Sequence, residues 1–116
     1  MRFVMTCASR ESWPRTRKAS RPWAASATVS FTETAALEWA RSGVRVNAVA
    51  PGPYWTPLQS SGGQPQEKVQ QFGEDTPLGR PGQPVEIAPL YVLLASDACS
   101  YASGQVWCSD GGTGVA

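Results

Sequence analysis

The residues best suited to bind a ligand lie in the stretch RVNAVAPGPYWTP, residues 45–57. A short, largely apolar run, VRVNAVA, is typical of a parallel strand buried on both faces, and prolines and a glycine then end it. In open α/β sheets, ligands bind in the crevice beyond the carboxyl ends of the strands. Prolines fix φ and remove backbone donors, whereas Gly52 permits close approach of another group. The stretch therefore predicts either a ligand-facing turn or an ordinary turn that ends a strand.

Other chemistry-bearing residue types are scarce. The chain has no histidine, and its three cysteines, Cys7, Cys99 and Cys108, do not have the spacing of metal ligands, so no metal site is predicted. With 41% hydrophobic and 16% charged residues and a net charge of +1, the composition favours neither a nucleic acid nor a membrane surface as partner. No stretch approaches the ~20 apolar residues that span a bilayer. The cysteine usage and the lack of an apolar signal-peptide core favour a cytoplasmic location.

Residues 1–25 differ from the rest of the chain. They contain six basic residues and one acidic residue, whereas residues 26–116 contain four basic and eight acidic residues. They show neither a helical nor a strand period, and Pro14 and Pro22 would interrupt either element, so we expect a disordered segment. An organelle transit peptide and translation in a wrong reading frame are two interpretations of this composition. The prolines and the missing apolar stripe favour the second.

From residue 26 onward the chain becomes regular. The run SATVSFTETAALEWARSGVRV predicts a helix that ends at Gly43 and packs on two sides, because its apolar and small residues cover more than one face. Residues 58–83 are rich in Gly, Pro, Gln and Ser, which indicates either a mobile flap over a ligand site or a solvated loop. Within this loop, Pro65 and Gly73 delimit one expected helical turn.

The remainder predicts a second helix and a second strand. Pro84 suits the first helical position, and an i, i+3, i+4, i+7 stripe follows it (Ile87, Leu90, Tyr91 and Leu94). Gly104 then leads into the strand QVWC and the turn SDGG. The order of elements is helix, strand, long loop, helix, strand. This order predicts two parallel strands joined by a right-handed crossover.

Three stretches together carry a family resemblance: VSFTETAALEWA, SGVRVNAVAPGPYWTP and TPLGRPGQPVEIAPLYVLLASDACSYASGQVWCSDGG. Their order and spacing resemble the C-terminal part of a classical short-chain dehydrogenase/reductase, over residues 26 to about 115. The resemblance implies an α/β fold in which residues 26–116 are the C-terminal portion of a Rossmann-like doubly wound domain. It also implies an oxidoreductase, commonly a homo-oligomer, that uses NAD or NADP to move a hydride between nicotinamide and a small carbonyl or alcohol substrate.

The resemblance also assigns cofactor-binding residues. Pro51 and Gly52 match the family's Pro-Gly turn, whose following backbone lies against the nicotinamide carboxamide. Tyr54 falls where the family usually has a branched aliphatic residue that offers backbone groups to that carboxamide, and Thr56 matches a threonine that bonds the cofactor. Asn47 matches an asparagine whose role is mainly structural. In addition, residues 58–78 correspond to the variable substrate loop, and residues 110–112 to the closing turn that supports the subunit interface.

The family's catalytic groups have no counterpart in the residues present. Counting along the helix places the positions of the family's Tyr-x-x-x-Lys at about Arg21 and Ala25, and neither side chain can exchange a proton with a substrate oxygen. No Gly-rich phosphate turn occurs before residue 43. We therefore predict no catalytic residue, and expect the chain to be inactive alone.

Two alternatives to an enzyme fragment stay open. The first is a non-catalytic oligomerisation module that pairs with an intact homologue through the helices expected at 27–42 and 84–95. The second is a free-standing binding domain of unrelated function that shares only the βαβ pattern.

Overall fold

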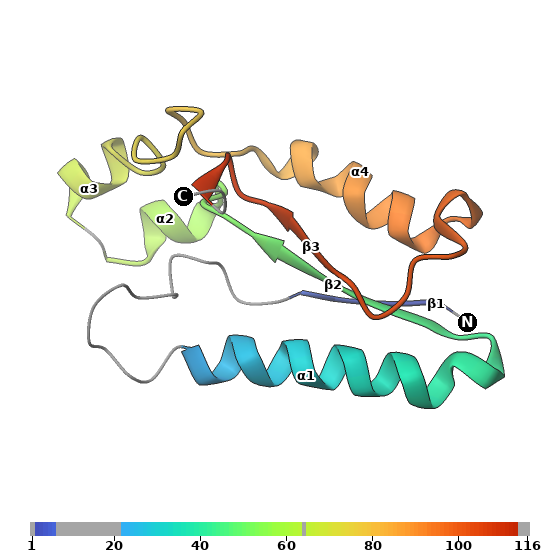
Figure 1. Ribbon diagram of the computed structural model, residues 1–116. Coiled ribbons are helices and arrows are strands. Elements are labelled where there is room, and N and C mark those ends of the chain that lie inside the picture. The colour runs from blue at the N-terminus through green and yellow to red at the C-terminus, as the bar shows by residue number, and fades with distance from the viewer. Residues whose placement is uncertain (1, 7–21, 64, 114–116) are drawn as a thin grey trace.

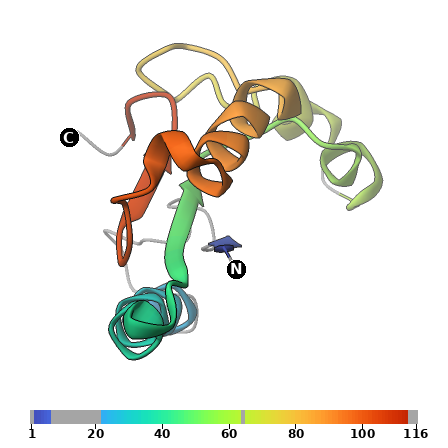
Figure 2. The same cartoon turned by 90° about the vertical axis from the view of Figure 1, so that its right-hand side faces the viewer.

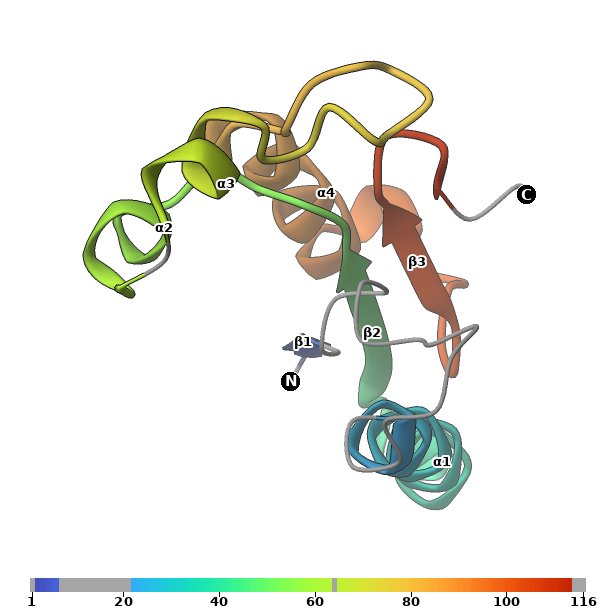
Figure 3. The same cartoon turned by 90° about the vertical axis from the view of Figure 1, so that its left-hand side faces the viewer.

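The computed structural model describes residues 2–6, 22–63 and 65–113, which form a three-stranded parallel sheet with helices on both faces (Figure 1). The strands are β1 (Arg2–Thr6), β2 (Arg45–Pro51) and β3 (Val106–Ser109), and β2 lies in the middle. Helix α1 (Pro22–Trp39) covers one face, and helix α4 (Pro84–Ala95) covers the other (Figure 3). This arrangement confirms the predicted α/β class and the predicted order of helix, strand, loop, helix and strand.

Helix α1 ends where the sequence predicted. A 3₁₀ turn, η2 (Ala40–Ser42), continues it, and Gly43 then adopts the left-handed conformation with φ of 71°. The Gly43 N–H donates to the Ala40 carbonyl at 3.0 Å, which satisfies one of the last carbonyls of the helix. Because this φ is strained for residues with a Cβ, glycine is the natural residue at this position.

Strand β2 is buried because it is flanked on both edges and both faces. It pairs in parallel with β1 on one side and with β3 on the other. Val46, Ala48 and Val49 have no exposed surface, and Val46 packs against Ala35 and Ala36 of α1. Full burial of a valine side chain stabilises the fold by about 1.5 kcal/mol or more. The apolar run that predicted this strand is therefore the core of the sheet.

One side of α1 packs on the sheet and the far side is exposed, so packing on a second side stays a prediction. Thr32, Ala35 and Ala36 are buried towards the sheet, whereas Phe31 and Leu37 keep half or more of their surface exposed. Within the described residues, no helix or strand therefore covers the apolar side chains on the far side of α1.

The prediction of disorder over residues 1–25 is wrong for residues 2–6. These five residues form β1, which pairs with β2 from Arg2 opposite Arg45 to Thr6 opposite Val49. The run RFVMT is too short to show a period of its own, and its backbone bonds come from residues 43 positions further along the chain. The sheet consequently has three strands rather than two. Residues 7–21 lie outside the described residues, so the transit-peptide and wrong-frame interpretations stay predictions.

The expected interruption by Pro22 is also wrong. Pro22 is the first residue of α1, a position where its missing N–H leaves no helical hydrogen bond unmade. The helix thus begins at residue 22 instead of residue 26.

Two polar side chains at the start of β2 fix the crossover from α4 to β3. The Arg45 guanidinium donates to the carbonyls of Leu94, Ser96 and Ala102 at 2.7, 3.1 and 3.1 Å. A cation at this point satisfies carbonyls that end α4 and complements the negative end of the helix. Asn47, 1% exposed, donates from Nδ2 to the Ala102 carbonyl at 2.9 Å, and its Oδ1 accepts from the Gln105 N–H at 3.2 Å. Asn47 therefore has the structural role that the resemblance implied.

The segment between β2 and α4 contains two short helices, α2 (Pro57–Ser61) and α3 (Gln66–Gln70). Helix α3 confirms the helical turn expected between residues 65 and 73, and α2 was not predicted. After α4, a 3₁₀ turn, η3 (Asp97–Cys99), follows Ser96. Both α2 and α3 lie on the side of the sheet that carries α4, away from α1 (Figure 2). No described helix combines the length and apolar character needed to cross a membrane.

Candidate functional site

The turn after β2 is pressed against the end of β3. Pro51 is the last residue of β2, and the N–H of Gly52, the next residue, donates to the Ser109 carbonyl at 2.9 Å. A Cβ at Gly52 would lie 2.5 Å from the Asp110 Cα, closer than real Cβ contacts allow. The position therefore requires glycine because two backbones meet there, as the sequence predicted for a close approach.

Beyond β2, Tyr54 forms an isolated parallel β-bridge with Gly82. The Gly82 N–H donates to the Pro53 carbonyl at 2.9 Å, and the Trp55 N–H donates to the Gly82 carbonyl at 2.8 Å. In this type of parallel bridge, the residues before and after Tyr54 make the hydrogen bonds, and the N–H and C=O of Tyr54 itself point away from Gly82. The backbone N–H and C=O of Tyr54 accordingly bond no other described residue. One donor and one acceptor, adjacent and fixed, are thus available to a ligand.

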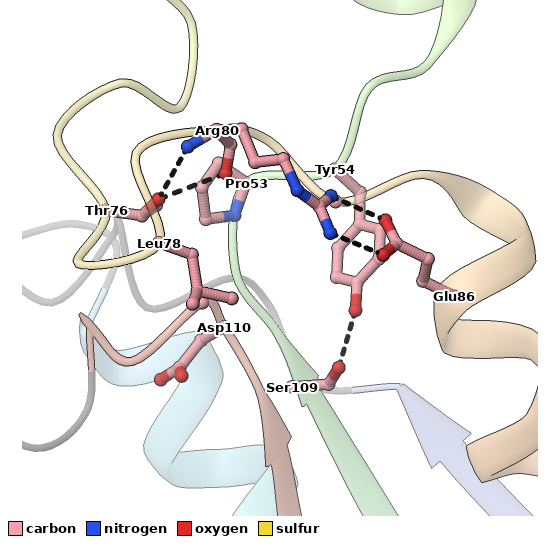
Figure 4. A pocket seen from close by; sticks show the side chains of 10 residues that line it. Pro53, Tyr54, Thr76, Leu78, Arg80, Glu86, Ser109 and Asp110 are labelled. Carbon is pink, nitrogen blue, oxygen red and sulfur yellow. Dashed lines mark hydrogen bonds and ion pairs between the residues drawn. The ribbon is translucent and has the colours of Figure 1, made fainter.

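The Tyr54 side chain fills the space on the other side of this turn (Figure 4). Its hydroxyl lies 2.5 Å from the Ser109 Oγ. A Cβ at Gly82 would lie 2.6 Å from the Tyr54 Cε1, so the ring fits only because residue 82 is glycine. The aromatic ring at a position where a branched aliphatic residue was expected is therefore accommodated by Gly82 and bonded by Ser109.

Thr56 lies at the N-cap of α2 without using its hydroxyl as a cap. The side chain is half-buried, and its Oγ1 bonds no other residue in the part of the chain that the structure describes. The hydroxyl is therefore available to a ligand. The structure thus gathers the four predicted residues, Pro51, Gly52, Tyr54 and Thr56, in one turn at the carboxyl end of the central strand.

A pocket of about 140 Å³ opens beside the Tyr54 ring (Figure 4). Its walls come from the turn after β2, the loop before α4, the first turn of α4 and the end of β3. The residues that line it are Pro53, Tyr54, Thr76, Leu78, Arg80, Gly82, Glu86, Ser109, Asp110 and Gly111. Sequence reasoning identified the first wall and, in residues 58–83, a candidate flap over a ligand site, but it did not predict that α4 and the end of β3 complete the pocket.

Thr76 fixes the loop that forms one of these walls. It is 7% exposed, and its Oγ1 lies 2.9 Å from the Gly73 carbonyl and 3.0 Å from the Arg80 carbonyl. The same oxygen accepts the Arg80 N–H at 3.3 Å. A single hydroxyl thus closes the turn over residues 73–80, which carries Arg80 to the mouth of the pocket.

Arg80 and Glu86 form a bidentate ion pair at the mouth of the pocket. Nη1 and Nη2 of Arg80 donate to Oε2 and Oε1 of Glu86 at 2.8 and 2.7 Å, and the Gln83 N–H donates to Oε2 at 2.7 Å. The hydrogen bonds from Arg80 and then from Gln83 lower the pKa of Glu86 from 4.5 to about 2, and the pKa of Arg80 is raised. Sequence reasoning did not predict this ion pair.

The lowered pKa of Glu86 predicts a pH-dependent contribution to stability. Because the folded-state pKa is depressed, the contribution is complete above pH 4.5 and is lost as the pH falls towards about 2. Glu86→Gln should therefore be less stable than wild type at neutral pH, and the two should converge near pH 2. Urea unfolding followed by tryptophan fluorescence at submicromolar concentration would measure this difference. Glu67→Gln, on exposed α3, is the control, and a Glu86→Gln curve parallel to wild type over this range would contradict the prediction.

The two positions expected for the family's catalytic Tyr and Lys hold no side chain that can exchange a proton with a substrate. Ala25 lies in the first turn of α1, and Arg21 lies outside the described residues. Within residues 2–6, 22–63 and 65–113, no group of three His, Cys, Asp or Glu side chains is placed to hold a metal ion.

The fold and the turn define a class: an α/β arrangement around a parallel sheet, with a turn beyond the central strand that leaves backbone groups available. The family model described as enoyl-(acyl carrier protein) reductase matches residues 6–114. With the relatives below, this match shows that the chain belongs to the short-chain dehydrogenase/reductase family of oxidoreductases. The match begins at residue 6, so it includes residues that the sequence resemblance, starting at 26, left out.

Similar sequences carry oxidoreductase names. The chain is 60% identical over 86 residues to an uncharacterized oxidoreductase, YhdF, of Bacillus subtilis, covering 74% of this chain and 29% of that protein. It is 50% identical over 90 residues to an Arabidopsis thaliana protein named NADPH-dependent aldehyde reductase 1, chloroplastic, covering 77% of this chain and 31% of that protein. The chain thus spans less than a third of the length of these curated relatives.

Solved structures agree with the fold over nearly the whole chain. Levodione reductase superposes with a TM-score of 0.81 and 32% identity, covering 97% of this chain and 46% of that one. A 3-oxoacyl-[acyl-carrier protein] reductase from Brucella melitensis with bound NAD gives a TM-score of 0.76 and 31% identity, covering 96% and 40%. The described elements therefore correspond to somewhat less than half of a complete enzyme of this family.

Proposed function

We propose that this chain supplies the nicotinamide-facing wall of an NAD(P)-dependent oxidoreductase that acts on a small carbonyl or alcohol substrate. The observation that carries the proposal is the pair of available backbone groups at Tyr54, with the Thr56 hydroxyl two residues further on. A nicotinamide carboxamide has one carbonyl acceptor and one NH₂ donor, which match an adjacent N–H and C=O. The bound NAD in a related structure supports this choice of cofactor.

The residues of the turn would each hold the carboxamide end of the cofactor in a different way. The Tyr54 N–H would donate to the carboxamide oxygen, the Tyr54 C=O would accept from its NH₂ group, and the Thr56 hydroxyl would add a further bond. Pro51 and Pro53 limit the backbone motion of the turn, and Gly52 keeps it against β3. When bound, the nicotinamide supplies the hydride or accepts it.

The chain alone is proposed to be inactive. Reduction of a carbonyl needs a group that gives a proton to the substrate oxygen, and the two matching positions are Arg21 and Ala25. An arginine has no accessible neutral form, and an alanine has no proton to give. The residues present also include no Gly-rich turn of the kind that binds the cofactor phosphates in this family. We place this inactive chain in the cytoplasm.

An oligomerisation module that pairs with an intact homologue is the second candidate. It is favoured by apolar side chains exposed on both outer helices, with Phe31 50%, Leu37 81% and Val92 69% exposed. Co-expression with a full-length relative separates the two roles. Co-purification in a fixed ratio supports the module, and recovery of a separate monomer removes it.

A chimera tests the proposed cofactor wall. Residues 26–116 would replace the matching segment of the Arabidopsis NADPH-dependent aldehyde reductase, which supplies the rest of the enzyme. We expect the chimera to retain NADPH-dependent reduction of an aldehyde. Thr56→Val in the chimera should weaken the binding of NADPH by about 10-fold, because a hydrogen bond of roughly 1.5 kcal/mol is lost.

The matched control is Thr34→Val, which removes an exposed threonine hydroxyl from α1. A chimera that folds, as judged by circular dichroism, yet does not bind NADPH would overturn the proposed function. Turnover by the purified 116-residue chain alone would overturn its proposed inactivity.

A further inference from the structure

The Tyr54 and Ser109 side chains join two segments that are distant in the sequence. Their oxygens are 2.5 Å apart, at the short end of the range for O–H···O bonds, although the residues are 55 positions apart. Ser109 is the last residue of β3, and its own backbone is paired with Pro51 of β2. The hydroxyl of Tyr54 is therefore tied to a residue whose backbone is paired within the sheet.

The Tyr54 backbone is held by a second partner, Gly82. The two hydrogen bonds of Pro53 and Trp55 with Gly82 fix the peptide groups before and after Tyr54. With the hydroxyl tied to Ser109 and the ring packed on Gly82, rotation about the Tyr54 backbone would break at least one of these contacts. The direction of the available N–H and C=O is thus determined by four contacts: two backbone hydrogen bonds, the hydroxyl bond and the ring packing.

We propose that Tyr54 and Ser109 act as positioning residues through a clasp, defined as the hydrogen bond between their two hydroxyls. The clasp holds the Tyr54 backbone amide in the orientation that receives the nicotinamide carboxamide. This inference rests on the proposed function, since it assigns a side-chain role within the proposed cofactor wall. It adds to the backbone role of Tyr54 a side-chain role that depends on its hydroxyl.

Hydrogen exchange of single amides tests the clasp in the full 116-residue chain. Tyr54→Phe and Ser109→Ala each remove one hydroxyl, and the double variant removes both. We expect the Trp55 and Gly82 amides to exchange about 2- to 10-fold faster in each single variant, the factor that one hydrogen bond gives. Because the hydroxyls act as a pair, the double variant should exchange no faster than the faster single variant.

Two references separate local positioning from general loss of stability. The Ala48 N–H, which donates to the Gln105 carbonyl at 2.9 Å within the sheet, should keep its exchange rate in every variant. Tyr101→Phe removes a fully exposed hydroxyl and should change none of the three amides. Unchanged Trp55 exchange in Tyr54→Phe, or equal acceleration at Ala48, would overturn the clasp.

Titration with nicotinamide mononucleotide separates the clasp from the proposed function. In wild type, the amide signals of Tyr54 and Thr56 should shift with this probe, and Tyr54→Phe should weaken its binding several-fold while Tyr101→Phe should not. A response in wild type that Tyr54→Phe leaves unchanged would overturn the positioning role. No response in wild type, with exchange rates as expected, would overturn the nicotinamide assignment and leave the clasp as a structural contact only.

A substitution at Gly82 gives a second test, through the contact between Gly82 and the Tyr54 ring. Gly82→Ala places a Cβ 2.6 Å from the Tyr54 ring, so it should accelerate exchange at Trp55. Combining it with Tyr54→Val, which removes the ring, should reverse most of the steric part of this effect. Equal effects of Gly82→Ala with either residue at position 54 would show that the ring does not occupy this space.

Discussion

Gly52→Ala should destabilise the chain by about 3 kcal/mol, a large fraction of the stability of an ordinary domain. The new Cβ would lie 2.5 Å from the Asp110 Cα and 2.8 Å from its Cβ, so backbone rather than a flexible side-chain end must move. Separating the two segments would also break the bond from the Gly52 N–H to the Ser109 carbonyl, which contributes about 1 kcal/mol. The turn after β2 would then lose its contact with β3.

Urea unfolding followed by tryptophan fluorescence at submicromolar concentration measures this change. Gly63→Ala is the control for the added methyl group, because no atom lies within 4 Å of the position that its Cβ would take; unlike Gly52, Gly63 has a positive φ, 71°. The control carries only the backbone cost of the left-handed conformation, about 1–2 kcal/mol. If Gly52→Ala cost no more than Gly63→Ala, the close contact with Asp110 would be wrong.

The elements that the sequence predicted well carry their signal locally. Pro84 and the stripe Ile87, Leu90, Tyr91 and Leu94 predicted α4, and each member of that stripe is at least partly buried. The apolar run before Pro51 predicted β2 within one residue at each end. An apolar pattern that buries one or both faces of an element can be identified in the sequence without knowing which elements pack against it.

The contacts that complete the site are not visible in this way. Ser109 lies 55 residues after Tyr54, and which residue at the end of β3 reaches the turn depends on the register of β2 with β3. Arg80 and Glu86 are only six residues apart, yet a Gly-containing turn between them sets their distance. Sequence reasoning therefore pointed to the turn of the proposed cofactor wall by its strand and prolines, whereas the proposed clasp and the pocket depend on the crossover between β2 and β3.

Strand β1 was missed for a related reason. Its five residues have no turn signal before them and no alternation, so their strand conformation derives from the free edge of β2. Composition alone, with six basic residues in the first 25, indicated disorder. Pairing with a buried strand outweighs that composition for Arg2–Thr6.

The 116-residue chain should self-associate and have only marginal stability as a monomer. Leu37 is 81% exposed on α1, and Val85 and Val92 are 74% and 69% exposed on α4. Each large apolar side chain left in water forfeits about 1.5–3 kcal/mol of possible burial, so a few of them equal the stability of a typical domain. Among the described strands, β1 also has one unpaired edge, which offers backbone groups to another chain. Sedimentation velocity at increasing protein concentration should show a rising sedimentation coefficient.

Substitutions on the two exposed faces identify the cause of that association. Leu37→Lys combined with Val92→Lys should restore a sedimentation coefficient that is independent of concentration, because each lysine places a charge in the apolar surface. The control, Gln66→Lys with Gln70→Lys on α3, adds the same charge at exposed polar positions and should associate like wild type. A wild-type chain that stays monomeric over the accessible concentrations and unfolds in one cooperative transition would show that the sheet and its two helices are sufficient as an independent domain.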